Sequence, residues 1–203
     1  MKMIKSGMSL LALLFSIQAW SQQFSTSILY NISVPVSNTA DYPSTTSFRG
    51  VNISPRVFLS ERFSLGISAG WQVFYEKRAP EAYVDDNLTL YGIQFRYINA
   101  FPLYLSPQFH LPAFAGFKPY AGLGIGTTYV KQTTNMGLYA FQSRDWLLGV
   151  YPEVGFTFPF RNDWHLTLSG KYNHMFGGKE LPTQAYWGIN AGFTHFFQGF
   201  RRY

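Results

Sequence analysis

The sequence predicts an all-β fold: an eight-stranded antiparallel up-and-down transmembrane β-barrel that is preceded by a cleaved signal peptide. Apolar and polar residues alternate with a period of two through most of the chain, which is the period of a strand. Aromatic residues make up 19% of the 203 residues and charged residues only 13%. The longest apolar run lies at the N-terminus, and no later segment has the ~20 apolar residues that a membrane helix needs.

Residues 1–21 have the features of a secretory signal peptide. Two lysines precede an apolar stretch over about residues 8–17, and Ala19 and Ser21 stand at positions −3 and −1 of a small-residue cleavage site. We therefore expect export by the Sec pathway and a mature barrel domain over residues 22–203. That domain has no cysteine, so disulfides cannot stabilise it.

Eight segments of the mature chain have one apolar face and one polar face. In the clearest, apolar residues stand at every second position from Phe63 to Tyr75, and the opposite face has Ser64, Gly66, Ser68, Gly70, Gln72 and Glu76. Pro102 interrupts the long fourth segment and predicts a kink or bulge there. The eight segments are 24–34, 47–59, 63–77, about 88–109, 119–130, 145–158, 165–176 and 185–197.

Two barrels of opposite polarity fit eight such strands. A soluble barrel of the lipocalin type hides the apolar face inside, whereas a membrane barrel turns it to lipid and keeps a polar interior. The small polar residues opposite the apolar face favour the membrane barrel, because they suit a narrow interior. Aromatic residues recur at strand ends, as in the girdles of membrane barrels: Tyr30, Phe48, Phe63, Trp71, Tyr75, Tyr129, Trp146, Phe158, Phe176, Trp187 and Phe197.

The connections tend to alternate in length, which also favours a membrane barrel. Long stretches of about ten to twelve residues, "RAPEAYVDDN" among them, precede the second, fourth and sixth strands, and short ones ("SER", "RNDW") precede the third and seventh. We expect the long ones to belong to four extracellular loops and the short ones to be periplasmic turns. "HLPAFAGFKP" is a longer turn on the periplasmic side.

The stretch "PYAGLGIGTTYV" has glycine at three alternate positions, Gly122, Gly124 and Gly126. Glycine weakens a strand unless space is needed beside it. We expect this glycine ladder to face the lumen and make room for bulky groups from neighbouring strands. Three tyrosines have the phase to be those groups: Tyr104, Tyr151 and Tyr186.

"FKPYAGLGIGTTYV" resembles the Pro-Tyr-Ala-Gly-x-Gly strand of small outer-membrane barrels of the OmpW, OmpX and OmpA-transmembrane type. The last strand, "NAGFTHFF", with Gly192, Phe193 and Phe197, is similar to the C-terminal signal that the barrel assembly machinery reads in Gram-negative bacteria. The chain departs from that pattern because "QGFRRY" follows the strand and His195 replaces an apolar residue. The resemblance implies a monomer in the cell outer membrane, with membrane lipid, lipopolysaccharide and the assembly machinery as partners.

The lumen face carries a few charged residues. Counting back from a tight turn near Asn162 places Glu153 opposite Lys171, and a confined interior favours a cross-strand ion pair; hydration by lumen water is the alternative. Other polar residues share the lumen phase, the two arginines as more distant basic groups: Arg56, Arg96, Gln72 and Glu76.

The histidines predict no metal or cofactor site, because no two of the four stand at metal-ligand spacing. Scattered basic residues give no support for nucleic-acid binding. Barrels of the PagL family, which remove acyl chains from lipid A, resemble this chain in size and use a His–Ser–Glu set. His174 and Glu180 fit that pattern, but Phe176 stands where the family has its serine, so we expect no enzymatic activity.

Three function classes stay open for the barrel. A structural or surface-interaction role is favoured, because side chains largely fill an eight-stranded barrel. A narrow porin-like channel for small solutes is the alternative, since interior glycines leave space. A lipid A-modifying enzyme is disfavoured for want of the serine. The expected extracellular loops are polar and carry no ligand motif.

Overall fold

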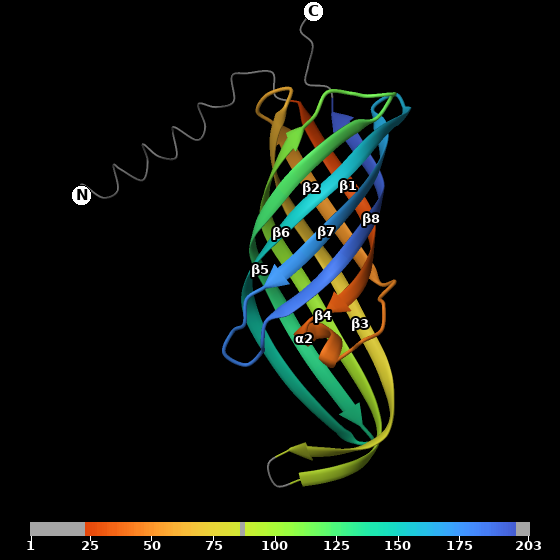
Figure 1. The fold of residues 1–203 in the computed structure, drawn as a ribbon, viewed down its shortest axis with the longest axis vertical. Helices are drawn as coiled ribbons and strands as arrows, with labels where there is room; N and C mark the ends of the chain where they lie inside the picture. The colour runs from red at the N-terminus through yellow and green to blue at the C-terminus, as the bar shows by residue number, and fades with distance from the viewer. Residues whose placement is uncertain (1–22, 86–87, 198–203) are drawn as a thin grey trace, which may run out of the picture.

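The strands of the protein form one closed barrel in which each strand pairs with the next and β8 pairs with β1 (Figure 1). The computed structural model describes residues 23–85 and 88–197, so the predicted signal peptide and the C-terminal "QGFRRY" lie outside the described residues. A short helix, α2 (Asn38–Asp41), follows β1. The strands are β1 (Phe24–Val36), β2 (Gly50–Phe58), β3 (Phe63–Asp85), β4 (Leu88–His110), β5 (Lys118–Met136), β6 (Tyr139–Arg161), β7 (Trp164–Met175) and β8 (Gln184–Phe197).

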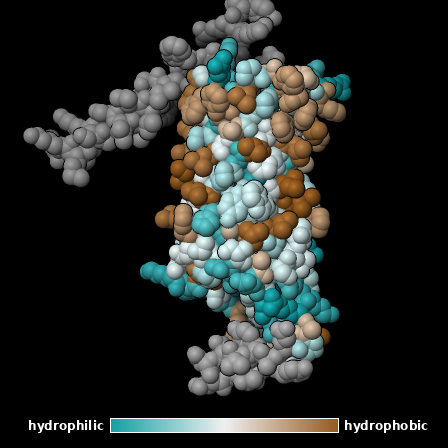
Figure 2. Space-filling view, in the orientation of Figure 1, coloured by the Kyte–Doolittle hydropathy of each residue, from teal (hydrophilic) through white to brown (hydrophobic). Residues whose placement is uncertain are grey.

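The predicted strand order is confirmed, and the two faces of the strands have the predicted polarity. Ile28 and Ile125 point outward and are 58% and 56% exposed, whereas Gln72 and Asn190 point inward and are 1% and 0% exposed. Figure 2 shows hydrophobic patches over the barrel wall and a hydrophilic surface toward the lower end, away from the start of β1. An apolar exterior around polar inward positions is the polarity of a membrane barrel.

Three strands, β3, β5 and β6, are much longer than the sequence predicted, whereas β4 has nearly its predicted bounds. β3, β4 and β6 have 23 residues each, whereas β2 has 9 and β7 has 12. The long hairpins project at the lower, extracellular end of Figure 1. The prediction that "RAPEAYVDDN" is a loop is therefore wrong, because β3 continues through most of it, as far as Asp85. The reason is physical: strands beyond the membrane have water on both faces, so they keep their ladder without an apolar alternation.

Pro102 does not mark the predicted bulge. It pairs in register with Thr128 of β5, and the β3–β4 pairing has the same register on both sides of it. The register shift between these strands lies instead at Arg78 and Glu81. A proline removes one ladder donor, and here the ladder continues past it without an extra residue.

The turns at the periplasmic end fix the registers that build the lumen. Asn162 and Asp163 form the tight β6–β7 turn that was predicted, with Asn162 at φ 49°. The longer β4–β5 turn is bridged by Phe114 and Phe117. No helix within the described part of the chain is long and apolar enough to cross a membrane.

Candidate functional site in the barrel lumen

The periplasmic half of the lumen is a cavity of about 400 Å³. Arg62 and Pro112 of the periplasmic turns also line it, so the cavity reaches the periplasmic mouth of the barrel. The polar side chains that matter most for its chemistry come from five different strands: Arg56, Gln108, Tyr120, Glu153 and Lys171.

Glu153 is the centre of this polar cavity. Its Oε2 lies 3.9 Å from Lys171 Nζ, and the two residues are direct partners in the β6–β7 register, as predicted. The equal-step count missed a register shift between Pro159 and Arg161, which offsets the two-residue turn. Gln108 Nε2 donates to the same carboxylate at 3.2 Å, and Tyr120 donates its hydroxyl at 3.1 Å. The side chains of Glu153 and Lys171 are 3% and 6% exposed, so the pair is buried in the wall of the cavity.

Arg56 belongs to the same cavity and is buried, at 5% exposed. Its guanidinium donates to the carbonyl of Ser106 at 2.9 Å and to the hydroxyl of the same residue at 3.2 Å. The hydroxyls of Ser64 and Ser54 accept further hydrogen bonds at 3.3 and 3.4 Å. Glu153 also attracts Arg56 electrostatically, so a single carboxylate acts on two buried cations.

Two tyrosines narrow the lumen on the extracellular side of this cavity. The rings of Tyr104 and Tyr151 meet edge to face with centroids 5.0 Å apart, and Lys171 Nζ lies 4.7 Å from the centroid of the Tyr151 ring. The hydroxyls of Tyr104 and Thr128 share a hydrogen bond of 2.8 Å. The space left between these groups is only about 10 Å³.

Each glycine of the ladder gives space to a close neighbour, and one of these neighbours is the ring of Tyr151. The Tyr151 ring lies directly over Gly124, where a Cβ would overlap it. At Gly126 a Cβ would come 2.7 Å from the Cα of Tyr104, and at Gly122 it would come 2.7 Å from Gln108 Cγ. The predicted role is thus confirmed for Tyr151. Tyr104 places its hydroxyl instead against Gly149 of β6, where a Cβ would come 2.5 Å from it.

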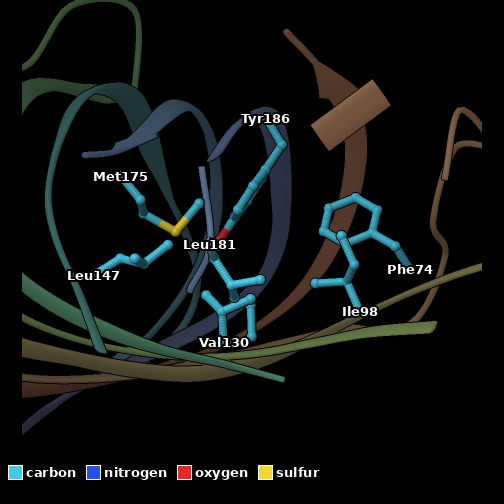
Figure 3. Close-up of a cluster of buried hydrophobic side chains, with 8 residues drawn as sticks. Phe74, Ile98, Val130, Leu147, Met175, Leu181 and Tyr186 are labelled. Atoms are coloured by element: carbon cyan, nitrogen blue, oxygen red, sulfur yellow. The ribbon is translucent and has the colours of Figure 1, made fainter. Parts of the chain in front are cut away.

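The third tyrosine takes part in a feature that the sequence analysis missed. Tyr186 packs edge to face on Phe74, with ring centroids 5.3 Å apart, on the extracellular side of the narrow point. It belongs to an apolar cluster inside the barrel, drawn in Figure 3, which we call the lumen plug. The lumen plug consists of Phe74, Ile98, Ala100, Val130, Leu147, Met175, Leu181 and Tyr186.

The expectation of a polar interior is therefore wrong for the extracellular half. The signal was available, because strand residues such as Leu147 and Met175 stand at lumen-phase positions although they are apolar. Leu181 could not be found in this way, since it comes from the β7–β8 connection, where no strand period applies.

The β1–β2 connection and α2 cover the lumen plug. Thr39 donates its hydroxyl to Gln184 at 2.8 Å, and Tyr42 and Thr134 share a hydrogen bond of 2.6 Å. The other predicted lumen residues hold this connection in place rather than lining the cavity. Gln72 Nε2 donates to the hydroxyl of Ser47 at 2.8 Å, Glu76 accepts from the hydroxyl of Ser44 at 3.1 Å, and Arg96 Nη1 donates to the carbonyl of Tyr42 at 3.3 Å.

The predicted assembly-signal residues lie on β8 beside β1. Phe193 and Phe197 point outward and are 48% and 46% exposed. Gly192 lies against the backbone of β1, where a Cβ would come 2.8 Å from Leu29 Cα. Within residues 23–85 and 88–197, no three His, Asp or Glu side chains form a group that could hold a metal ion.

Comparisons with known proteins agree with this architecture. The family model described as "Outer membrane protein beta-barrel domain" matches residues 8–196. A Rickettsia bellii protein whose name assigns it to the outer membrane is 28% identical over 131 residues, which cover 62% of this chain and 50% of that protein. This chain therefore spans about half the length of that relative.

Two solved structures share the fold at low sequence identity. Neisserial surface protein A has a TM-score of 0.53 at 14% identity, over 88% of this chain and 98% of that chain. OprG from Pseudomonas aeruginosa has a TM-score of 0.51 at 12% identity, over 87% of this chain and 95% of that chain. From the family match and the closed eight-stranded barrel, we conclude that the chain belongs to the outer membrane protein β-barrel family.

Proposed function

We propose that the protein is a closed outer-membrane barrel with a structural or surface-interaction role, exposing a projecting β-sheet outside the cell. The single observation that carries this proposal is the lumen plug. Water-filled barrels have a polar interior along their whole length. Here Leu147, Phe74 and Ile98 are 0%, 1% and 2% exposed in the middle of the extracellular half.

The narrow point on the periplasmic side of the lumen plug supports the same proposal. The gap beside Tyr104 and Tyr151, at about 10 Å³, is roughly the volume that one water molecule needs. A solute that entered the periplasmic cavity would meet these two rings first and the lumen plug behind them. The cavity is the observation that favours the channel alternative, but it ends at a blocked passage.

The projecting strands support the surface-interaction part of the proposal. A tilted membrane strand needs ~9–11 residues, so β3, β4 and β6, with 23 each, have roughly a dozen residues beyond that need. Paired strands hold this excess in a fixed shape, which lowers the entropy cost of binding a partner.

The proposal assigns no catalytic role to His174. Its ring stacks beside Tyr172 at 6.2 Å between centroids and meets Phe176 at 5.0 Å, so two aromatic rings flank it. Phe176 offers no nucleophile at the position where the PagL family has a serine. Release of fatty acid from lipopolysaccharide by the wild type, lost in His174→Ala, would contradict this part of the proposal.

Planar-bilayer recording of the purified full chain tests the central claim. We expect no steady conductance from the wild type. The matched variant combines Phe74→Ser, Leu147→Ser and Tyr151→Ala, which makes the plug polar and opens the narrow point. This variant should conduct if it keeps the heat-modifiable gel mobility of a folded barrel. A large and stable current from the wild type would replace the proposal with the channel alternative.

A further inference from the structure

Four aromatic side chains form a continuous row on the outer surface of β3 to β6. The Trp71 and Phe101 rings are stacked with centroids 6.1 Å apart, Phe101 and Tyr129 are 6.2 Å apart, and Tyr129 and Trp146 are 5.3 Å apart. Outward aromatic girdles stand where the hydrocarbon of a membrane meets its headgroups. The row therefore marks the extracellular membrane boundary on this side of the barrel.

The next outward residue on the extracellular side of this row is polar on three strands. On the extracellular side, Asn99 is next to Phe101 on β4, Lys131 is next to Tyr129 on β5, and Arg144 is next to Trp146 on β6. Lys131 is a direct register partner of both Asn99 and Arg144, so the three side chains are neighbours.

Arg49 continues this line across β3. Its carbonyl accepts the backbone N–H of Val73 at 2.9 Å, and Val73 is the register partner of Asn99. We call Arg49, Asn99, Lys131 and Arg144 the polar row. Its three cations stand beside the aromatic row, at headgroup level.

No ion pair of the described residues joins a carboxylate to a side chain of the polar row. The ion pairs of the described residues join Arg78 to Glu76 and Lys171 to Glu153, and none of these four residues belongs to the polar row. Two carboxylates lie near Arg144, and both accept backbone hydrogen bonds. Asp145 has the opposite phase and accepts the N–H groups of Trp146 and Glu180, and Glu180 accepts the N–H of Arg144 at 3.2 Å. The polar row thus presents net positive charge to the outer leaflet.

An apolar groove of about 390 Å³ lies on the barrel exterior at the β2 to β4 end of the row. Val51, Val73 and Trp71 provide its apolar walls, and Arg49, Tyr97 and Asn99 also line it. Trp71 Nε1 donates to Asn99 Oδ1 at 3.3 Å, which fixes the indole as one wall. The groove is thus apolar, with Arg49 and Asn99 of the polar row among its lining residues.

We propose that the groove and the polar row bind one molecule of phosphorylated glycolipid of the lipid A type from the outer leaflet. The groove takes one of its acyl chains, and its phosphates lie against Arg49, Lys131 and Arg144. Guanidinium and ammonium groups bind phosphate through charge-assisted hydrogen bonds. Lipid A has phosphates on both sugars of a disaccharide, which suits cations spread along a row better than a single-phosphate lipid does.

Native mass spectrometry of the purified full chain in detergent tests this site, with hexa-acylated bisphosphorylated lipid A as the probe. We expect one tightly held copy, and weaker binding of the phosphate-free lipid and of phosphatidylglycerol. Lys131→Gln and Arg144→Gln should each weaken binding roughly fivefold, the effect of one basic group near an anionic lipid surface. Arg161→Gln removes an exposed cation at the periplasmic end, and should leave binding unchanged.

A second pair of variants tests the groove without changing any charge. Val73→Trp fills the groove and should weaken lipid A binding, whereas Val154→Trp, at an outward position in the periplasmic half, should not. Equal binding by charge variants and controls, or equal binding of phosphatidylglycerol, overturns the proposal. Because these residues point outward, folding is expected to persist, and heat-modifiable gel mobility checks it for every variant. The outcome is independent of whether the lumen conducts.

Discussion

Glu153 and Lys171 face each other across β6 and β7, with Oε2 and Nζ 3.9 Å apart in the wall of the periplasmic cavity. Gln108 and Tyr120 donate hydrogen bonds to the same carboxylate, and the buried guanidinium of Arg56 is attracted to it. One anion thus compensates two buried cations, so the two partners of the ion pair are not equivalent.

This asymmetry predicts unequal costs for removing each partner. Glu153→Gln leaves Arg56 and Lys171 without a counter-charge and should lower the free energy of unfolding by about 3–5 kcal/mol. Lys171→Met leaves Glu153 with Arg56 and should cost less. Urea unfolding in lipid vesicles, run as a double-mutant cycle, measures both costs and the coupling between them. Equal costs with no coupling would show that cavity water screens the pair.

The glycine ladder predicts two kinds of response to added side chains. Gly124→Ala meets the ring of Tyr151, a side chain, so a smaller residue at 151 should relieve its cost of about 1–3 kcal/mol. Gly126→Ala meets the backbone of β4, so the same second change should not relieve it. Gly170→Ala is the control, because nothing lies within 4 Å of a Cβ there. Rescue of Gly126→Ala by Tyr151→Leu would contradict the assignment.

Two adjacent leucines test the lumen plug. Leu147 is 0% exposed inside the barrel, and its neighbour Leu148 is 71% exposed on the lipid-facing surface. Leu147→Ala should cost about 2–5 kcal/mol of unfolding free energy, because it leaves a cavity among packed side chains. Leu148→Ala should cost much less, since lipid fills the space. The same vesicle unfolding measurement compares them, and similar losses would mean that the plug is loosely packed.

The tight β6–β7 turn tests how the register of the ion pair is set. Asn162 has φ 49°, in the left-handed region where asparagine and glycine are tolerated. Asn162→Val should destabilise the barrel by about 1–2 kcal/mol, whereas Asn162→Gly should be nearly neutral. Refolding yield and unfolding in vesicles report both effects. A neutral Asn162→Val would mean that the turn does not fix the register.

Much of the barrel wall could be predicted, because one physical constraint acts along every membrane strand. Lipid outside and a narrow interior inside impose a period of two, which is legible in residues such as Ile28 and Ile125. The pairing of Glu153 with Lys171 was also predicted, by counting from a turn centred on Asn162. The observed turn has two residues, and a register shift between Pro159 and Arg161, which the count did not include, brings the pair opposite each other.

The extracellular half could not be predicted in the same way. Beyond the membrane the alternation of apolar and polar residues weakens, so the pattern does not predict the extracellular extensions of β3, β5 and β6. The helix α2 and Leu181 reach the lumen from connections, and no periodicity locates them. Arg56 was expected at a distance, and only the closed barrel brings it into the cavity of Glu153.

The sequence by itself determined which side of each membrane strand faces lipid and the eight-stranded order, because alternation and short turns are local properties. The tertiary structure alone decided what fills the interior. Side chains from separate strands meet there only after the registers around the whole ring are set. That closure brings Phe74, Leu147 and Met175 together as a plug, and places Tyr151 over Gly124.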